Sequence, residues 1–536
     1  MAVSDDRKFT SEQVYNLLES AKGKTLGEVD KSHQFARTID KPKITGIAGD
    51  VIEQSVFGYE RDSKQECDIE IDGVLTELKT TGVRVPKSDL RFANGKTGDE
   101  YNIYLAAKEG ISVTGVTFEP DIQRDFATSH FWEKSERMLL VFYEYKSYNA
   151  VPASDYAQFP IVDYCHNSFS DEEKAKLQND WELVCQYLKR IYDTYENQDE
   201  RNLQLVGFTR VLRPNLLLIE LVPAFKIKPK QNGDDTIQRP RYRLKKTFVN
   251  YIVKGHFDKS RADKEIKLKQ PFSSFAELDK RCHALTEKYK GYTLQQFKEL
   301  FGIDSKFSTK QFTAQCITKM FDADCKKLND VSDFEKAGIL AKTVTLTENG
   351  GKTEDMKLDR IHFGEWLSTD VEFEESEIFS YFSEHSFLCP IFKERGDMRP
   401  RRKSENKKTF NERIERESAL ITFEGFKRLT FDDDFMYNDI KKTWDDSRDL
   451  VATGKLKWVF ERTKSGKKKK NRKSKSFKGA PNFPKSQHYN VFFRGGSNDS
   501  SDKFRTECVN GIKMLPQFFW IKGLYIVDKL NEIPFI

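Results

Sequence analysis

The sequence predicts a mixed α/β protein built from two tandem domains, each a short mixed sheet flanked by helices. Its 536 residues exceed what a single hydrophobic core supports. Each half alternates strand-like stretches with amphipathic, helix-like stretches. A set of similar segments also recurs in the same order in the second half.

The recurring segments define the domain organisation. Gly23-Lys-Thr-Leu26 returns as Gly291-Tyr-Thr-Leu294, the Lys79 region as the Lys342 region, Trp181 as Trp444, and residues 244–253 loosely as residues 520–529. Their separations stay between about 263 and 276 residues. We therefore predict domains over residues 1–262 and 263–536, with the seam near a charged segment around residue 260.

Within the first half, hydrophobic spacing predicts helices over residues 10–22 and 44–57. Residues 67–80 alternate in the manner of strands, and residues 138–145 are apolar and aromatic enough for a buried strand. Residues 172–195, around Trp181, predict a long amphipathic helix whose tryptophan anchors it in the core.

Composition narrows the class of protein without identifying it. A net charge of +6 with 38% hydrophobic residues indicates a globular chain and does not by itself indicate a nucleic-acid binder. Lysine and arginine are concentrated at residues 464–478 and 399–408, although a solvated loop is the simplest explanation for either tract alone. No bilayer-spanning stretch or signal core is visible, and the eight cysteines are scattered. We expect a cytoplasmic protein with reduced thiols.

The strongest local signal is Asp68-Ile-Glu-Ile-Asp-Gly-Val-Leu-Thr-Glu77-Leu-Lys79. Asp-Gly between two alternating runs predicts a two-residue hairpin, in which Asp68 lies opposite Glu77. Side chains alternate along a strand, so Lys79 shares the face of Glu77. Glu70 also lies on this face and stays open as an alternative to Asp68.

Two carboxylates and an ammonium group on one patch suit phosphodiester hydrolysis. The carboxylates can hold Mg²⁺, which keeps several waters and bridges to a phosphate oxygen. The metal activates a bound water and stabilises the leaving oxygen, and the lysine orients the water or offsets charge on the phosphoryl group. The alternative is a solvent-facing hairpin with cross-strand ion pairs.

The ordered context of this hairpin resembles the MutH family of mismatch-repair nicking endonucleases. The resemblance runs through residues 23–28, residues 49–58, Glu77 to Thr80, residues 128–134, the Trp181 helix, residues 227–230 and residues 244–248. The tandem arrangement, with Arg494-Gly-Gly-Ser-Asn498 near the end, is more similar to the Sau-type GATC-cleaving type II restriction endonucleases, which fuse two MutH-like domains.

The resemblance implies roles for individual residues. Asp68, Glu77 and Lys79 match the catalytic acids and lysine, although eight residues separate the acids here where the family usually has six. Glu53 matches a glutamate beside the metal, and Lys134 a lysine near the scissile phosphate. The residues matching those that contact DNA are Lys228, Pro229 and Lys230, whose loop reads bases in the major groove. Arg243 stands where the family has a base-contacting tyrosine, and the neighbouring Tyr242 is an alternative for that role.

The second copy lacks the acids. Lys342 aligns with Lys79, but Leu340 replaces Glu77, and leucine cannot bind Mg²⁺. We expect residues 263–536 to bind DNA without cutting it, as an effector domain with a basic insertion near residues 464–478 that contacts phosphates. A loop of Arg494, Gly495, Gly496, Ser497 and Asn498 contacts bases or phosphates there.

The resulting hypothesis is a Mg²⁺-dependent type II restriction endonuclease that cuts double-stranded DNA at a short palindrome, GATC by resemblance, leaving 5′-phosphate and 3′-hydroxyl ends. With one active site per chain, we expect a monomer in solution that pairs with a second chain on DNA. Two alternatives stay open: a mismatch-repair-type nicking endonuclease, and a non-catalytic DNA-binding sensor of modification.

Overall fold

The computed structural model describes residues 5–60, 67–86, 89–148, 151–227, 237–351, 354–361, 363, 372–470, 477–497 and 501–536. The chain forms two compact units. The first comprises residues 1–147, 151–278 and 329–339, and the second comprises residues 148–150, 279–328 and 340–536. The first unit therefore includes a short segment from the middle of the chain.

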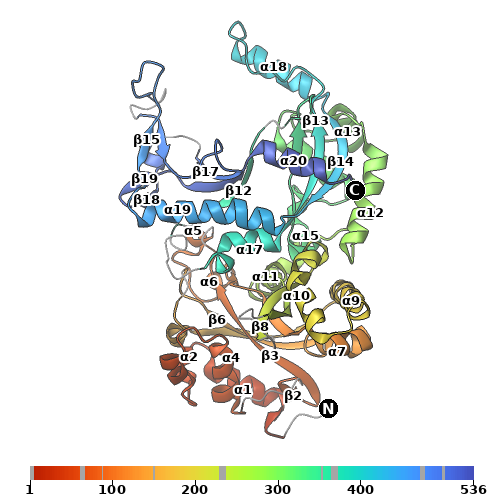
Figure 1. The fold of residues 1–536 in the computed structure, drawn as a ribbon, viewed down its shortest axis with the longest axis vertical. Helices are drawn as coiled ribbons and strands as arrows, with labels where there is room; N and C mark the ends of the chain where they lie inside the picture. The colour runs from red at the N-terminus through yellow and green to blue at the C-terminus, as the bar shows by residue number, and fades with distance from the viewer. Residues whose placement is uncertain are drawn as a thin grey trace. The chain divides into compact units, whose positions relative to one another are not determined.

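A mixed sheet forms the centre of the first unit (Figure 1). Its strands follow the order β1-β2-β3-β6-β7, and β4 pairs with β3. The strands are β1 (Lys8–Phe9), β2 (Ile69–Ile71), β3 (Val74–Arg84), β4 (Ala106–Ala107), β6 (Arg137–Glu144) and β7 (Ile161–Ser168). Strands β3 and β6 run parallel, whereas β6 and β7 are antiparallel. The strands predicted over residues 67–80 and 138–145 are confirmed.

Helices cover both faces of this sheet. On one face, buried residues of α1 (Ser11–Ala21), α2 (Leu26–Val29) and α4 (Ile47–Val51) form a core with Ile69, Ile71 and Leu78. Helix α4 continues as a π-helix, Ile52–Phe57, so the helices predicted over residues 10–22 and 44–57 are confirmed. On the other face, the Phe142 ring lies 5.4 Å from that of Phe257 in α11 (Lys246–Phe257).

The remainder of the first unit is mainly helical, with one further sheet. That sheet has the order β5-β9-β8. Its strands are β5 (Ile111–Gly115), β8 (Ile219–Ile227) and β9 (Ile237–Leu244). Its further helices are α3 (Arg37–Asp40), α5 (Leu90–Ala93), α6 (Asp99–Asn102), α7 (Phe118–Gln123), α8 (His130–Glu133), α9 (Asp171–Thr194), α10 (Gln198–Leu212) and α15 (Ser332–Ala337). Helix α9 is the predicted long helix, and Trp181 lies in the core with 3% of its surface exposed.

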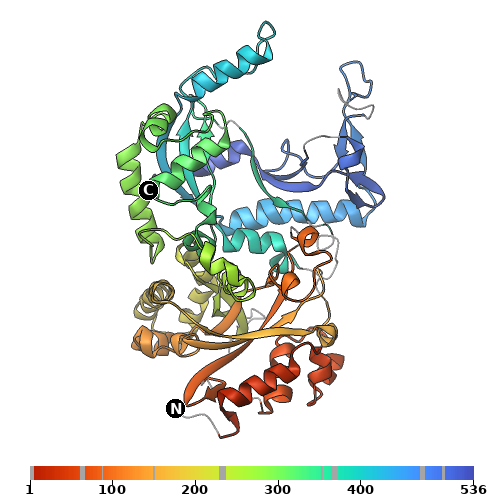
Figure 2. The same cartoon turned by 180° about the vertical axis from the view of Figure 1, so that it is seen from behind.

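The second unit has its own sheets and core (Figure 2). Its strands are β10 (Ile339–Ala341), β11 (Val344–Leu346), β12 (Met356–Arg360), β13 (Ser386–Lys393), β14 (Thr422–Leu429), β15 (Trp458–Phe460), β16 (Gly479–Pro481), β17 (Val491–Gly495), β18 (Glu507–Val509), β19 (Ile512–Met514) and β20 (Gln517–Ile521). Its helices are α12 (Phe275–Tyr289), which begins at the end of the first unit, α13 (Leu294–Phe301), α14 (Lys310–Met320), α17 (Glu377–Glu384), α18 (Lys407–Ser418), α19 (Lys442–Ala452) and α20 (Gly523–Glu532).

The two units share an order of elements and several equivalent contacts. Thr25 and Thr293 both form capping boxes at a helix start. Strand β13 is parallel to β11 and antiparallel to β14, as β6 is to β3 and β7. The sheet β12-β20-β17 has the strand order of β5-β9-β8. A mixed α/β architecture is thus present in both units.

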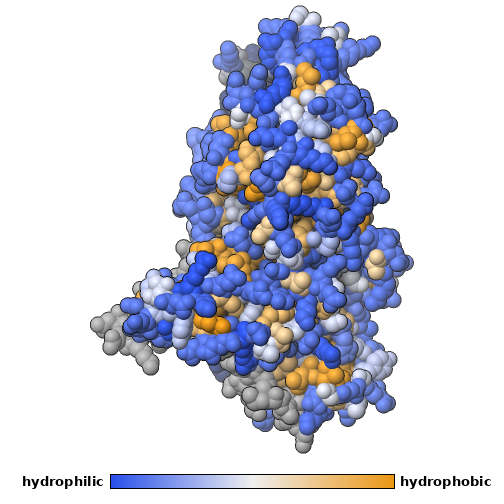
Figure 3. Space-filling view, turned by 90° about the vertical axis from the view of Figure 1, so that its right-hand side faces the viewer, coloured by the Kyte–Doolittle hydropathy of each residue, from blue (hydrophilic) through white to orange (hydrophobic). Residues whose placement is uncertain are grey.

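Polar side chains dominate the surface seen in Figure 3, where hydrophobic residues form small separate groups. In the part of the chain that the structure describes, no helix combines the length and apolar character needed to cross a bilayer.

One ion cluster ties three elements of the first unit together and makes its stability depend on pH. Asp163 in β7 accepts hydrogen bonds from Lys22 at 2.9 Å and pairs with His256 of α11 at 3.1 Å. Burial alone would raise the pKa of Asp163, but the hydrogen bonds from His256 and Lys22 outweigh it and lower the pKa to about 2. The resulting stabilisation is present above the ordinary aspartate pKa and is lost as pH falls towards 2.

We therefore expect Asp163→Asn to lower the free energy of unfolding by about 1 kcal/mol at neutral pH, after allowing for solvent screening. Urea unfolding at pH 7 and near pH 3 measures the effect, and the difference from the wild type should shrink at the lower pH. Asp155→Asn, which changes an exposed carboxylate of the same unit, is the control. An equal loss at both pH values would contradict the assignment.

Candidate active site

The hairpin between β2 and β3 has the predicted turn and register. Asp72 and Gly73 adopt positive φ angles of 49° and 81°, the left-handed conformation of a type I′ turn. Ile69 pairs with Thr76, and Ile71 with Val74. Carrying this register one step outward places Asp68 opposite Glu77, as the sequence predicts.

The two faces of the hairpin differ as expected. Ile69, Ile71 and Leu78 belong to the core beneath the sheet. Asp68 lies at the start of β2, and its carboxylate accepts a hydrogen bond of 3.0 Å from the backbone N–H of Leu78. That contact holds the Asp68 side chain beside β3, next to Glu77.

Two lysines hold the Glu77 carboxylate. Glu77 is 1% exposed, and its Oε1 accepts a hydrogen bond of 2.5 Å from Lys79. Lys134, which follows α8, donates to both carboxylate oxygens at 2.9 and 3.1 Å. The alternation of side chains along the strand predicts Lys79 at this site, whereas Lys134 is indicated only by the family resemblance.

The charges at this site influence one another strongly. Burial and the negative charge of Glu77 raise the pKa of Asp68 to about 6. Burial alone would lower the pKa of Lys79, but Glu77 and Asp68 outweigh it and raise the pKa to about 12. Lys79 therefore carries a proton at neutral pH, which favours charge stabilisation and orientation of water over proton abstraction.

Glu53 lies in the π-helix that packs near β3. A Cβ atom added to Gly49 would meet Thr80 Oγ1 at 3.6 Å and Glu53 Oε1 at 3.8 Å, so Glu53 and Thr80 lie close to the same point. The negative charge of Glu53 also contributes to the raised pKa of Lys79. Glu53 thus belongs to the electrostatic surroundings of the predicted acids.

Tyr59 is a residue of this region that the sequence did not indicate. It is 2% exposed, and no hydrogen-bond partner for its hydroxyl is found among the described residues. Burial raises its pKa, and the charges of Glu53 and Asp68 raise it further. A single tyrosine outside any motif gives no sequence signal, because its position depends on the path of the chain between α4 and β2.

The donor set suits a magnesium ion held by two carboxylates. The described residues contain no group of three or more acidic, histidine or cysteine side chains placed to hold a metal. Mg²⁺ needs only one or two protein carboxylates, because waters and substrate phosphates complete its shell. Burial and the negative charge of Glu77 both raise the pKa of Asp68, and a divalent cation would relieve the repulsion between the two carboxylates.

The predicted DNA-contacting residues of the first unit differ from one another in their surroundings. Lys228, Pro229 and Lys230 lie outside the described residues. Tyr242 is completely buried, with its ring 5.2 Å from that of Phe131, so it contributes to the core and presents no atom to DNA. Arg243 pairs with Glu220 across the β8–β9 ladder at 2.7 Å.

The second unit has no equivalent pair of acids on the matching strand. The parallel pairing of β11 with β13 can be extended backwards along the chain. It then aligns Lys342 with Lys79 of the first unit, and Leu340 with Glu77. Leu340 packs against the hydrophobic core. Burial lowers the pKa of Lys342, in contrast to the raised pKa of Lys79.

The predicted DNA-contacting loop of the second unit begins at the end of β17. Arg494 pairs with Asp355 at 2.7 Å, and its guanidinium lies over the Trp520 ring. Gly495 and Gly496 follow closely against β20, where a Cβ on Gly496 would come within 2.5 Å of the Phe518 ring. Ser497 is described, whereas Asn498 lies outside the described residues.

The two basic tracts have different structures. In the tract at residues 464–478, the described residues belong to an antiparallel arm that extends the β15–β16 pair through bridges Arg462–Lys468 and Lys470–Phe477. Residues 464–470 are exposed there. In the tract at residues 399–408, Arg399 and Arg402 pair with Asp397, so this tract is partly neutralised.

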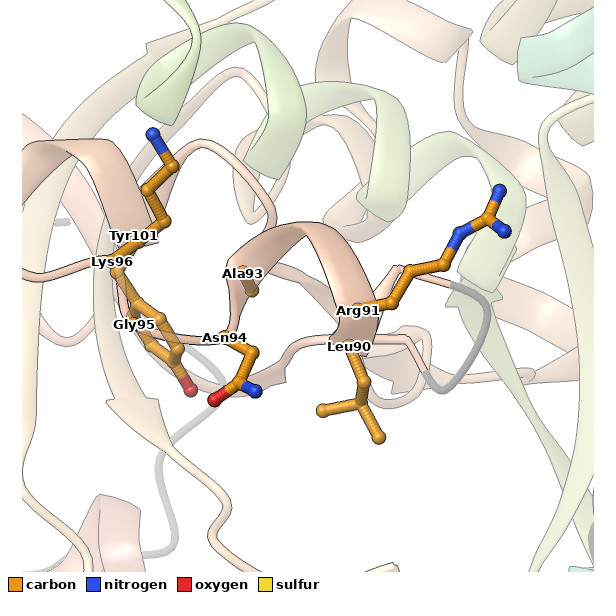
Figure 4. Close-up of a pocket in the computed structure, with 7 residues that line it drawn as sticks. All are labelled: Leu90, Arg91, Ala93, Asn94, Gly95, Lys96 and Tyr101. Atoms are coloured by element: carbon orange, nitrogen blue, oxygen red, sulfur yellow. The ribbon is translucent and has the colours of Figure 1, made fainter.

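One pocket of the first unit is formed around helix α5 (Figure 4). Its lining comprises Leu90, Arg91, Ala93, Asn94, Gly95, Lys96 and Tyr101. The lining has no carboxylate and none of the predicted site residues. It is therefore not a candidate metal site, and the hairpin cluster remains the candidate active site.

Comparisons with known proteins agree with this location. Residues 57–180 match the family of the DNA mismatch repair enzyme MutH, and this stretch contains Asp68, Glu77, Lys79 and Lys134. The type II restriction enzyme Sau3AI of Staphylococcus aureus is 24% identical over 561 aligned residues, covering 98% of this chain and 99% of that enzyme. The similarity therefore runs through both units.

Proposed function

Because the chain carries a MutH-like domain and is similar to a Sau-type restriction endonuclease along nearly its whole length, we propose that it is a type II restriction endonuclease. Its substrate is double-stranded DNA, cut at a short palindrome. GATC is the proposed target, with 5′-phosphate and 3′-hydroxyl ends as products. The observation that carries the proposal is the buried Glu77, held by Lys79 and Lys134 beside Asp68.

The proposed reaction is hydrolysis of a phosphodiester bond. A water gives up a proton as its oxygen bonds to phosphorus, the bond from phosphorus to the 3′ oxygen breaks, and that oxygen takes up a proton. Asp68 and Glu77 are the proposed ligands of Mg²⁺, with Glu53 near them. Bound Mg²⁺ supplies Lewis-acid chemistry, lowering the pKa of a coordinated water and neutralising charge on the phosphate.

The lysines have a separate proposed role. Lys79 is protonated at neutral pH, so it is suited to orienting the attacking water and stabilising negative charge as the phosphoryl group reacts. Lys134 donates to both oxygens of Glu77 and holds the carboxylate in one orientation. Its proposed second role is to contact the scissile phosphate once DNA is bound.

The second unit is proposed to bind DNA without cutting it. Leu340 occupies the position of Glu77, and leucine provides no metal ligand. Each chain then has one active site, so cutting both strands requires a second chain or two successive nicks. We propose that two chains pair on a palindromic site, since a two-fold symmetric assembly matches a two-fold symmetric sequence.

Incubation of supercoiled plasmid carrying GATC sites with the purified protein tests the proposal. Discrete linear fragments ending at GATC should form with Mg²⁺ and should be lost with EDTA, because the carboxylates alone do not activate water. End-labelling then shows which end carries the phosphate. A plasmid without GATC is the control.

The products separate the alternatives. Open circles alone would indicate a nicking enzyme of the mismatch-repair type. A plasmid that stays intact in Mg²⁺, although the protein binds it, would indicate a non-catalytic sensor and would overturn the proposal.

A further inference from the structure

One face of the sheet β12-β20-β17 in the second unit combines aromatic rings with cations. Arg494 and Phe518 are paired in the β17–β20 ladder, and Lys357 and Trp520 are paired in the β12–β20 ladder. Side chains two residues apart on β20 share a face. The opposite face, which includes Phe519 and other residues, is part of the core. Phe518 and Trp520 are partly exposed on the face that bears the cations.

The cations lie directly on these rings. Lys357 Nζ is 3.6 Å from the centre of the Phe518 ring, and the Arg494 guanidinium is 4.6 Å from the centre of the Trp520 ring. A Cβ added to Gly496 would lie 3.4 Å from Lys357 Nζ, so the backbone that follows β17 passes close to this ammonium. The rings therefore hold both cations near the glycine-rich end of β17.

Lys485 adds a third positive charge. The backbone N–H of Phe493 donates to the carbonyl oxygen of Pro484 at 3.1 Å, which places Lys485 alongside the strand that bears Arg494. Burial and the positive charge of Arg494 lower the pKa of Lys485 to about 8. Among the described residues, no carboxylate forms an ion pair with Lys485 or with Lys357. A partly buried cation beside another cation is unfavourable unless an anion joins it.

The equivalent sheet of the first unit lacks this arrangement. Its register is the same, since Leu244 faces Ile111 and Ile219 as Ile521 faces Met356 and Val491. At the next position along each strand, the first unit has Ser112, Glu220 and Arg243. At the same position, the second unit has Lys357, Phe492 and Trp520. Glu220 pairs with Arg243 at this position, so the first unit has an ion pair where the second unit has a lysine beside a tryptophan.

We propose that Lys357, Arg494 and Lys485 form a binding site for the phosphate groups of a DNA backbone. This inference rests on the proposed function, which supplies DNA as the ligand, and it adds how the second unit contacts that DNA. Phosphates are anions, and among the described residues only Arg494 of these three cations forms an ion pair with a carboxylate. The site contacts DNA without reading its sequence.

Binding of fluorescent duplexes with and without GATC, measured in EDTA over a range of NaCl concentrations, tests the inference. Lys357→Ala and Lys485→Ala should each reduce the slope of log affinity against log salt by about 1, since each removes one phosphate contact. Each should weaken binding of both duplexes by about 3- to 10-fold at moderate salt. Lys485→Arg should retain the slope of the wild type.

Lys513→Ala is the matched control, because it removes an exposed lysine from β19 of the same unit. Thermal midpoints show that each variant is folded. Unchanged slopes in both lysine variants would overturn the inference, and so would weaker binding confined to the GATC duplex. If the wild type cuts GATC plasmid while the slopes are unchanged, only the inference fails. If the wild type neither binds nor cuts DNA, the proposed function fails with it.

Discussion

Glu77→Gln should reduce cleavage by roughly 10³-fold or more, because it removes a negative charge from a proposed magnesium ligand. Glutamine keeps the shape of the side chain and can still accept hydrogen bonds from Lys79 and Lys134, which hold Glu77 in the native site. Asp68→Asn should have an effect of similar size. Single-turnover cleavage of a duplex with one target site measures both.

Glu70→Gln is the matched control for these carboxylates. Glu70 shares the face of Asp68, but Asp68 is the carboxylate that the backbone N–H of Leu78 holds beside Glu77, so we predict that Asp68 is the first acid. We expect Glu70→Gln to cleave within about 3-fold of the wild type, as for a surface substitution away from the chemistry. DNA affinity in EDTA shows that the variants are folded. Loss of cleavage in Glu70→Gln with normal cleavage in Asp68→Asn would reverse the assignment of the first acid.

Lys79→Met should lower the single-turnover rate by about 10²- to 10³-fold, as for the loss of one group that stabilises transition-state charge. Methionine fills a similar volume without the ammonium group. Glu77 keeps its hydrogen bonds from Lys134, which limits the effect on folding. DNA affinity should change much less than the rate.

Lys342→Met provides an internal comparison, since the strand register aligns Lys342, which lies between β10 and β11, with Lys79. With Leu340 where Glu77 would be, this lysine has no carboxylate neighbour on its strand to help hold a metal. We expect cleavage by Lys342→Met to match the wild type within about 3-fold. Equal losses in the two variants would mean that both strands take part in catalysis.

Local chemistry explains which features could be predicted from the sequence. The Asp72-Gly73 turn sets its own register, so the opposition of Asp68 and Glu77 follows from about a dozen residues. Lys134 contacts Glu77 across 57 positions of the chain, and no local pattern reveals such a contact. Family resemblance was needed to find it.

The same limitation explains where the sequence was less informative. The pairing of Arg243 with Glu220 depends on the register of β8 against β9, which the sequence did not define. Tyr242 and Arg243 are neighbours in a strand and so point to opposite faces, one into the core and one outward. Lys485 lies outside every motif, and its importance appears only when β17 places Arg494 beside it.

The segment of residues 329–339 has a consequence for how this protein is made. Lys176 in α9 is buried in an ion pair with Asp333 of this segment, and Lys336 pairs with Glu173 at 2.9 Å. A chain that stops at residue 278 would lack both ion pairs, together with the helix α15 that packs against α11. During synthesis on the ribosome, the unit that bears the acids therefore gains these contacts only after residue 339 has emerged. A chain that is terminated at residue 278 should therefore not yield a fully folded first unit.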